Sequence, residues 1–196
     1  MSAKIVRIVV WGAVAIAVVV VLYIRYTTSK VNRIISEANA LIDEGNAKEK
    51  ELGPEANQFF MGVVPKAFFV NGTAPKDSVL DRAKLEKSVA KTNEILTQVE
   101  ESFRAAAAKF DEGTRGGKSG AVSKYLELMS QAYQKRADAE EAHLKAVALL
   151  LDKSIPQVEL RKKCGELFIE ARKLEGDFDR LEAEAAKLHG DNNKFN

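Results

Sequence analysis

Apolar residues recur along much of the chain at intervals that alternate between four and three positions. This is the heptad spacing with which one face of a helix packs against neighbouring helices, and it predicts long helices over residues 78–112 and 155–189. The first series is Leu85, Val89, Thr92, Leu96, Val99, Phe103, Ala106 and Phe110, and the second is Leu160, Cys164, Leu167, Ala171, Leu174, Phe178, Leu181, Ala185 and Leu188.

A third series lies between these two and predicts a helix over residues 120–153. Its members are Val122, Leu126, Met129, Tyr133, Ala137, Glu140, Leu144, Val147 and Leu151. Two successive intervals of four meet at Tyr133 and Ala137, which is a stutter in the heptad pattern. The glycine-rich residues 113–120 separate this helix from the one before it. Ser154 is expected to cap the helix that follows, with Pro156 in its first turn.

A shorter stripe, Val31, Ile35, Ala38 and Ile42, predicts a helix over residues 29–52 that continues from the N-terminal segment and stops at Gly53-Pro54. Because the connections between the later helices are short, neighbouring helices are expected to run antiparallel. The predicted fold is therefore all-α: an antiparallel up-down bundle of three to four coiled-coil-like helices over residues 29–190. Residues 191–196 form a polar tail.

The N-terminal residues have a different pattern. The 17 residues from Ile8 to Ile24 carry no charge, and counted from Ile5 the stretch spans 20 residues, or about 30 Å of helix, the thickness of a bilayer's hydrocarbon core. A single-pass transmembrane helix through residues 5–24 is therefore predicted, within an anchor formed by residues 1–28. Trp11, Tyr23, Arg25 and Tyr26 are expected at the membrane interface.

The alternative for this segment is a cleaved secretory signal. Such a signal ends in small residues, whereas this apolar run ends in Leu22-Tyr23-Ile24. An uncleaved signal-anchor is therefore expected. Basic residues flank both ends of the run in similar number, so the charges decide little about orientation. Charges that lead into a long translocated domain count for less, which favours a bundle on the extracytoplasmic (periplasmic) side.

A phenylalanine-rich segment, residues 54–76, interrupts the helices and is expected to be irregular. Four of the nine phenylalanines lie within 11 residues of it, outside any heptad series. An apolar patch that the core does not use often marks a contact with a partner. The equally weighted alternative is that the segment folds back over one end of the bundle. The candidate partner contact comprises Phe59, Phe60, Met61, Phe68, Phe69 and Val70.

Several motifs resemble functional sites but lack part of the required pattern. GTRGGKS at 113–119 resembles a phosphate-binding loop, yet it is one residue short and follows a predicted helix instead of a strand. Glu140-x-x-His143 has the spacing of a di-iron ligand pair, but no second such motif exists. A solvated contact between Glu140 and His143 is expected instead. Cys164 falls within a heptad series, where cysteine acts as a small buried apolar residue.

Composition adds two limits. Four basic residues and no acidic residue lie in the first 30 positions, which leaves 26 basic and 28 acidic residues in the remainder. No basic stripe of the kind that binds nucleic acid is present, so neither a nucleic-acid nor a nucleotide partner is expected. The chain offers two histidines and no nucleophile placed beside a base. No catalytic residue, cofactor or metal is therefore predicted.

The function expected from these features is that of a non-enzymatic, membrane-anchored helical scaffold or accessory subunit. It would dock partner proteins at a membrane surface, or pair with further copies of itself. The alternative is an extracytoplasmic ligand-binding or sensory four-helix bundle that acts through a partner.

Overall fold

The computed structural model describes residues 3–52, 82–115, 120–152 and 154–191. Within these ranges the side chains of residues 3–17, 24, 82–85, 88, 157, 161 and 189–191 lie outside the description. The described residues form the helices α1 (Ala3–Glu51), α4 (Arg82–Thr114), α5 (Ala121–Leu151) and α6 (Gln157–Asp191), with no strand among them. The predicted all-α class is confirmed.

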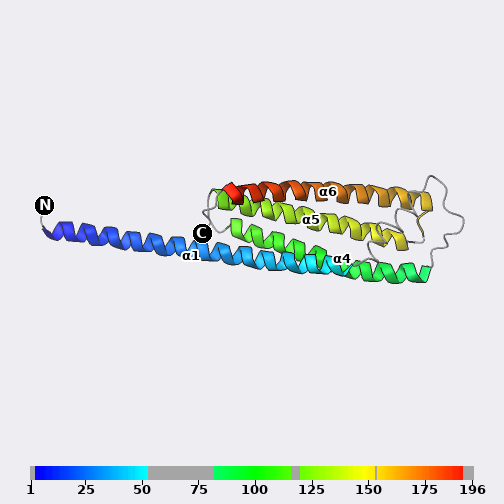
Figure 1. The fold of residues 1–196 in the computed structure, drawn as a ribbon, viewed down its shortest axis with the longest axis horizontal. Coiled ribbons are helices and arrows are strands. Elements are labelled where there is room, and N and C mark those ends of the chain that lie inside the picture. The colour runs from blue at the N-terminus through cyan, green and yellow to red at the C-terminus, as the bar shows by residue number, and fades with distance from the viewer. Residues whose placement is uncertain (1–2, 53–81, 116–119, 153, 192–196) are drawn as a thin grey trace.

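The four helices are arranged as a helical bundle in which consecutive helices run in opposite directions (Figure 1). α4 packs against both α1 and α5, and α5 packs against α6. The N-terminal part of α1 projects well beyond the ends of the other three helices, so the chain has a rod at one end of a bundle (Figure 1).

The heptad series predicted in the sequence supply the core. In α4 the series is buried without interruption at Val89, Thr92, Leu96, Val99, Phe103, Ala106 and Phe110. Along α6 four of the nine members are buried, and the other five are half-buried. The buried members are Cys164, Ala171, Leu181 and Ala185. In α5 the series ends early, because Leu151 is 38% exposed.

The apolar face of α1 differs slightly from the predicted one. Ile34 is 1% exposed, whereas the predicted Ile35 is only half-buried. The buried positions are Val31, Ile34, Ala38, Ile42 and Gly45, with spacings of three, four, four and three residues. The reason lies in the neighbours of Ile34, since its side chain packs beside Gly113 of α4, where the lack of a side chain leaves room.

In the connection between α5 and α6, the hydroxyl of Ser154 donates to Asp152 Oδ1 at 2.6 Å. In the first turn of α6, the Leu160 N–H donates to the Pro156 carbonyl at 2.9 Å. The predicted cap by Ser154 stays a prediction. At the start of α5, Gly120 has φ +89°, a conformation that glycine adopts without strain.

Several predicted segments lie outside the described residues. The phenylalanine-rich segment 54–76, including Phe59, Phe60, Met61, Phe68, Phe69 and Val70, is one of them, and the tail after Asp191 is another. The predicted span, residues 5–24, falls mostly on residues whose side chains are not described, Trp11 among them. Of the other predicted interface residues, Tyr23 is 63% and Tyr26 70% exposed, and Arg25 is exposed as well.

In the described part of the chain, no helix contains a stretch both long enough and apolar enough to cross a membrane. The structure therefore does not support the transmembrane helix, which stays a prediction from the sequence.

Candidate functional site: a buried arginine cluster

The most unusual chemical feature of the interior is a charged cluster centred on Arg136 of α5. Its side chain is only 19% exposed, and Nη2 lies 2.6 Å from Glu49 Oε1 of α1. Arg136 Nε lies 3.5 Å from Oε1 of Glu140, one turn further along α5. Since an unpaired charge in such a place is costly, the two carboxylates offset the free-energy cost of burying the guanidinium.

Aromatic rings enclose the guanidinium on two sides. Arg136 Cζ lies 5.7 Å from the centre of the Phe103 ring of α4 and 5.8 Å from that of Phe178 of α6. Both distances are within the range of a cation–π contact. Arg136 therefore contacts all three of the other helices, α1 through Glu49 and α4 and α6 through the two rings.

Tyr133 lies one turn before Arg136 in α5, and its ring packs with those of Phe103, Phe110 and Phe178. The centre of its ring is 5.4 Å from Phe178, 5.8 Å from Phe103 and 6.1 Å from Phe110. Burial, together with the nearby carboxylate of Glu182, raises the pKa of the Tyr133 phenol. The phenol is therefore neutral at physiological pH and acts as a packing group with a polar end.

The spacing along α5 explains why polar residues reach the interior at this level. Arg136 and Glu140 continue the alternating spacing of Leu126, Met129 and Tyr133, so both face inward, and the stutter adds Ala137 beside Arg136 on the buried face. Burial by itself lowers the pKa of Arg136, but the carboxylates of Glu140 and Glu49 raise it by more, so that the net change in the pKa is upward. The guanidinium is consequently a fixed positive charge.

Glu140 and His143 make the predicted contact, with 3.2 Å between Nδ1 and Oε2. The expectation that this contact is solvated was wrong, because Glu140 is 3% exposed. Glu140 faces inward since it lies on the heptad series one turn from Arg136, which supplies its countercharge. Among the described residues, no group of three or more histidine, cysteine or acidic side chains could hold a metal ion.

A second charged network lies on the surface between α4 and α5. Arg104 of α4 pairs with Glu100 at 2.5 Å, with Asp138 at 3.4 Å and with Glu141 at 3.1 Å. These are partly exposed pairs, which contribute little individually but fix the two helices relative to each other.

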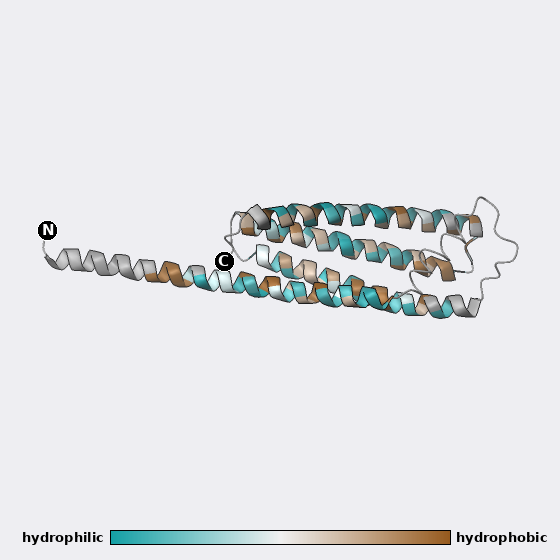
Figure 2. Cartoon of the chain, in the orientation of Figure 1, coloured by the Kyte–Doolittle hydropathy of each residue, from teal (hydrophilic) through white to brown (hydrophobic). Residues whose placement is uncertain are grey.

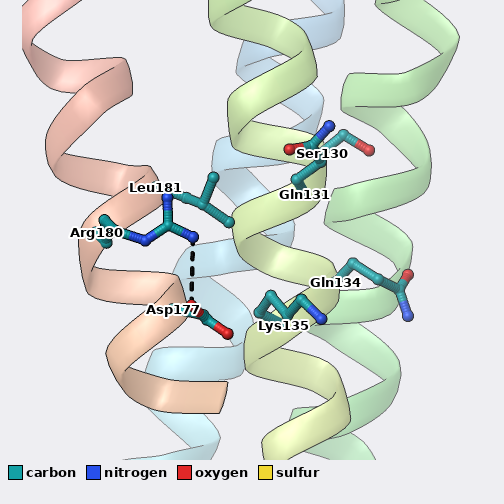
Figure 3. Close-up of a pocket in the computed structure, with 7 residues that line it drawn as sticks. All are labelled: Ser130, Gln131, Gln134, Lys135, Asp177, Arg180 and Leu181. Atoms are coloured by element: carbon teal, nitrogen blue, oxygen red, sulfur yellow. Dashed lines mark hydrogen bonds and ion pairs between the residues drawn. The ribbon is translucent and has the colours of Figure 1, made fainter. Parts of the chain in front are cut away.

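An open cleft with a volume of about 350 Å³ lies between α5 and α6 (Figure 3). It is lined by Ser130, Gln131, Gln134, Lys135, Asp177, Arg180 and Leu181. Much of its polar lining is already paired. Ser130 donates to the Ala107 carbonyl at 2.9 Å, Gln134 donates to Asp138 at 2.8 Å, and Arg180 pairs with Asp177 at 3.3 Å.

The remaining motifs have structural roles or lie outside the description. Cys164 is 1% exposed, and its thiol donates to the Ala146 carbonyl at 3.6 Å, which confirms it as a buried packing residue. Burial raises the pKa of this thiol. Of the GTRGGKS motif, Gly113 and Thr114 belong to α4, and residues 116–119 are not described.

Sequence reasoning missed Arg136 and Glu49 as a partly buried pair. The available signal was the stutter at Tyr133 and Ala137 together with Glu140 on an otherwise apolar series. The partner, Glu49, is 87 residues away in the chain. No periodic pattern within one helix can identify such a partner.

Comparison with known proteins gives no further guidance: no protein-family model matches this chain, and neither a curated protein nor a solved structure does.

Proposed function

We propose that this protein is a non-enzymatic, membrane-anchored helical scaffold or accessory subunit that docks partner proteins at a membrane surface. The observation that carries the proposal is the continuity of α1, one helix from Ala3 to Glu51. It joins an exposed apolar stretch at its N-terminal side to the core of the bundle, where the first buried residue is Val31.

The described end of the apolar stretch has no partner within the bundle. Val18, Val19, Val20, Val21 and Leu22 are each between 48% and 65% exposed. They form the strongly hydrophobic band on the projecting part of α1 (Figure 2). A helix that is apolar on every side belongs in a hydrocarbon environment or a protein interior, and the sequence continues this character back to Ile5.

The connection between this stretch and the bundle is short and stiff. Leu22 and Val31 are separated by about 13 Å of helix, without glycine or proline. The helical turns there include a bond from the Thr27 hydroxyl to the Tyr23 carbonyl at 3.0 Å. A bundle held in this way keeps a fixed distance from the bilayer and a limited range of tilts, which suits a docking platform.

The buried charged cluster supports a structural role instead of a catalytic one. The donors of Arg136 are directed at Glu49 and Glu140, and its faces are covered by Phe103 and Phe178. Groups engaged in this way hold four helices in register. The phenylalanine-rich residues 59–70 remain the candidate partner contact on sequence grounds.

Anchorage is tested by alkaline carbonate extraction of membranes from cells that express the full-length chain. Wild type is expected in the pellet, and the double variant Val18→Lys/Val20→Lys in the supernatant, because lysine near the end of the span shortens it below bilayer thickness. The matched control, Val158→Lys/Ile169→Lys, changes two exposed residues of α6 and is expected to stay in the pellet. Release of wild type by carbonate would refute anchorage.

Docking is tested by mild-detergent purification of the full-length chain followed by mass spectrometry. Specific partners, or a defined homo-oligomer, are expected and should be lost when Phe59, Phe60, Phe68 and Phe69 are changed to serine. A monomer without any reproducible partner would contradict the docking role. Protease treatment of cells whose outer membrane has been opened, with the inner membrane intact, tests orientation, since a periplasmic bundle would then be digested and a cytoplasmic one protected.

The alternative function, a ligand-binding or sensory bundle, is favoured by one observation, the open cleft between α5 and α6 (Figure 3). It ranks second because Ser130, Gln134 and Arg180 of the cleft are already paired. A ligand that binds only the folded state would raise the melting temperature, and a variant with Lys135→Ala would lose that rise.

A further inference from the structure

The charged residues of the bundle are segregated along its long axis. Ile34, Gly113 and Leu126 lie in one layer, since a Cβ at Gly113 would stand 3.3 Å from Ile34 Cγ2 and 3.0 Å from Leu126 Cδ1. α6 reaches this layer just before Lys187. Phe178 packs on Tyr133, and counting about 1.5 Å per residue from that contact puts Lys187 about 3 Å beyond Leu126.

We call the end of the bundle at and beyond this layer, on the side of the apolar stretch of α1, the base. Every charged side chain described there is basic. The residues are Arg25, Lys30, Arg33, Arg115, Lys124 and Lys187. They come from α1, α5, α6 and the turn that follows α4, and all are exposed apart from the half-buried Lys30. The side chain of Asp191, at the end of α6, lies outside the description.

Acidic residues begin immediately on the other side of the layer. They are Glu37, Asp111, Glu112, Glu127 and Glu184. Three basic residues of the base pair back toward these acids, Arg33 with Glu37 at 3.5 Å, Lys124 with Glu127 at 3.4 Å and Arg115 with Asp111. The net charge of +2 for the whole chain therefore conceals a positive base and a mainly acidic belt behind it. The belt also contains Lys109, which pairs with Glu37 at 2.9 Å and with Glu112 at 3.4 Å.

The base lies at the distance from the apolar stretch at which lipid headgroups are found. Lys30 lies six residues after Ile24, and Ile34 lies ten residues after Ile24. These separations correspond to about 9 Å and 15 Å of helix. The headgroup region extends several ångströms beyond the hydrocarbon core, and the Debye length at physiological ionic strength is about 8 Å. A bundle anchored through α1 would thus hold these side chains within electrostatic reach of the headgroups.

From this arrangement we infer that the base of the bundle binds the headgroups of anionic lipids, so that the bundle rests on the membrane surface instead of standing free of it. The inference rests on the proposed anchorage. A positively charged end that faces the bilayer is complementary to an anionic surface, and the acidic belt is placed away from that surface.

The test uses the full-length chain reconstituted in nanodiscs of neutral phosphatidylcholine, or of phosphatidylcholine mixed with phosphatidylserine. Amide hydrogen exchange is measured in peptides from residues 108–115, 121–130 and 180–188. At low salt these peptides are expected to exchange about threefold more slowly in the anionic nanodiscs. Raising the ionic strength to about 1 M, where the Debye length is about 3 Å, should abolish the difference.

The variant Arg115→Gln/Lys124→Gln/Lys187→Gln is expected to lose the difference. A matched control, Lys91→Gln/Lys145→Gln/Lys163→Gln, removes the same charge from residues far from the base and should retain it. Lys145 and Lys163 also pair with acids of their own helices, Glu141 and Glu159, so the control breaks comparable pairs.

The outcomes separate this inference from the proposed anchorage. A chain that is not recovered with neutral nanodiscs would refute the anchorage. A chain recovered with both kinds of nanodisc, but exchanging equally in both, would overturn only the lipid contact. Binding of the base to an acidic protein partner, detected as protection that appears on adding that partner and not on adding phosphatidylserine, would overturn it as well.

Discussion

Gly45 of α1 lies directly against the ring of Phe103 of α4. A Cβ at position 45 would stand 2.7 Å from Phe103 Cε1 and 3.1 Å from Cδ1. Phe103 is 1% exposed and is held on its other faces by Tyr133 and Arg136. Helices α1 and α4 can approach this closely only because residue 45 has no side chain.

Gly45→Ala is therefore expected to destabilise the protein, although alanine favours helix by about 1 kcal/mol relative to glycine. Displacing a packed ring should cost about 1–3 kcal/mol, enough to outweigh that gain. Thermal unfolding followed by circular dichroism measures the effect. The control is Gly176→Ala on α6, where an added Cβ meets nothing within 4 Å. That variant should be more stable than wild type, and equal effects at both positions would contradict the close approach.

Removing the Arg136 side chain should be the most damaging single change in the charged cluster. Arg136→Met removes the permanent positive charge beside Glu140, 3% exposed, and leaves its carboxylate with the His143 imidazole. A loss of about 3–5 kcal/mol in the free energy of unfolding is expected. The double variant Arg136→Met/Glu140→Leu should recover much of this loss, because no buried charge then remains unpaired.

An exposed ion pair provides the control for that prediction. Lys163 and Glu159 are 2.8 Å apart, with side chains 46% and 52% exposed. Lys163→Met is expected to change the stability by less than about 0.5 kcal/mol. Urea unfolding of the variants measures the differences. If Arg136→Met were as mild as Lys163→Met, Arg136 would not hold the helices together.

The raised pKa of Tyr133 predicts a loss of stability at high pH. Burial is the main cause, and the carboxylate of Glu182 adds to it. Because the folded protein keeps the phenol protonated while the unfolded chain loses the proton near pH 10, the unfolded state binds fewer protons above that pH. Stability should therefore fall as the pH rises from about 10 upward.

Tyr133→Phe isolates this contribution from that of the lysines, several of which also have raised pKa values, such as Lys109 and Lys145. The variant should show a shallower decline in melting temperature above pH 10 than wild type. An identical pH dependence in the two proteins would mean that burial does not raise the pKa of the Tyr133 phenol.

Cys164 should be chemically inert in the folded protein. The side chain is 1% exposed, so a reagent cannot reach the sulfur atom. Burial also raises the pKa of the thiol, which lowers the fraction present as the reactive thiolate. Modification by a thiol reagent at pH 8 is expected to be slower by at least about a hundredfold in native buffer than in denaturant. Rapid modification of the native protein would show that α6 separates from α5 around the Ala146 carbonyl.

The periodicity of the sequence was sufficient for the helices and for most of the core. Val89, Val99, Phe103 and Phe110 are buried as their spacing predicts. The face of α1 was less well predicted, with Ile34 in place of Ile35. Periodicity locates the apolar side of a helix to within one position, and the shape of the neighbouring helix selects the residue.

The sequence by itself determined the class of fold, the order and length of the helices and the burial of Cys164, because each of these follows from residues a few positions apart on one helix. Only the tertiary structure decided that Glu49 neutralises Arg136, that Gly45 admits Phe103, and that basic residues of α1, α5, α6 and the turn after α4 lie at one end of the bundle. Those relationships join residues dozens of positions apart, and their distances are set by how the helices pack, which no local pattern records.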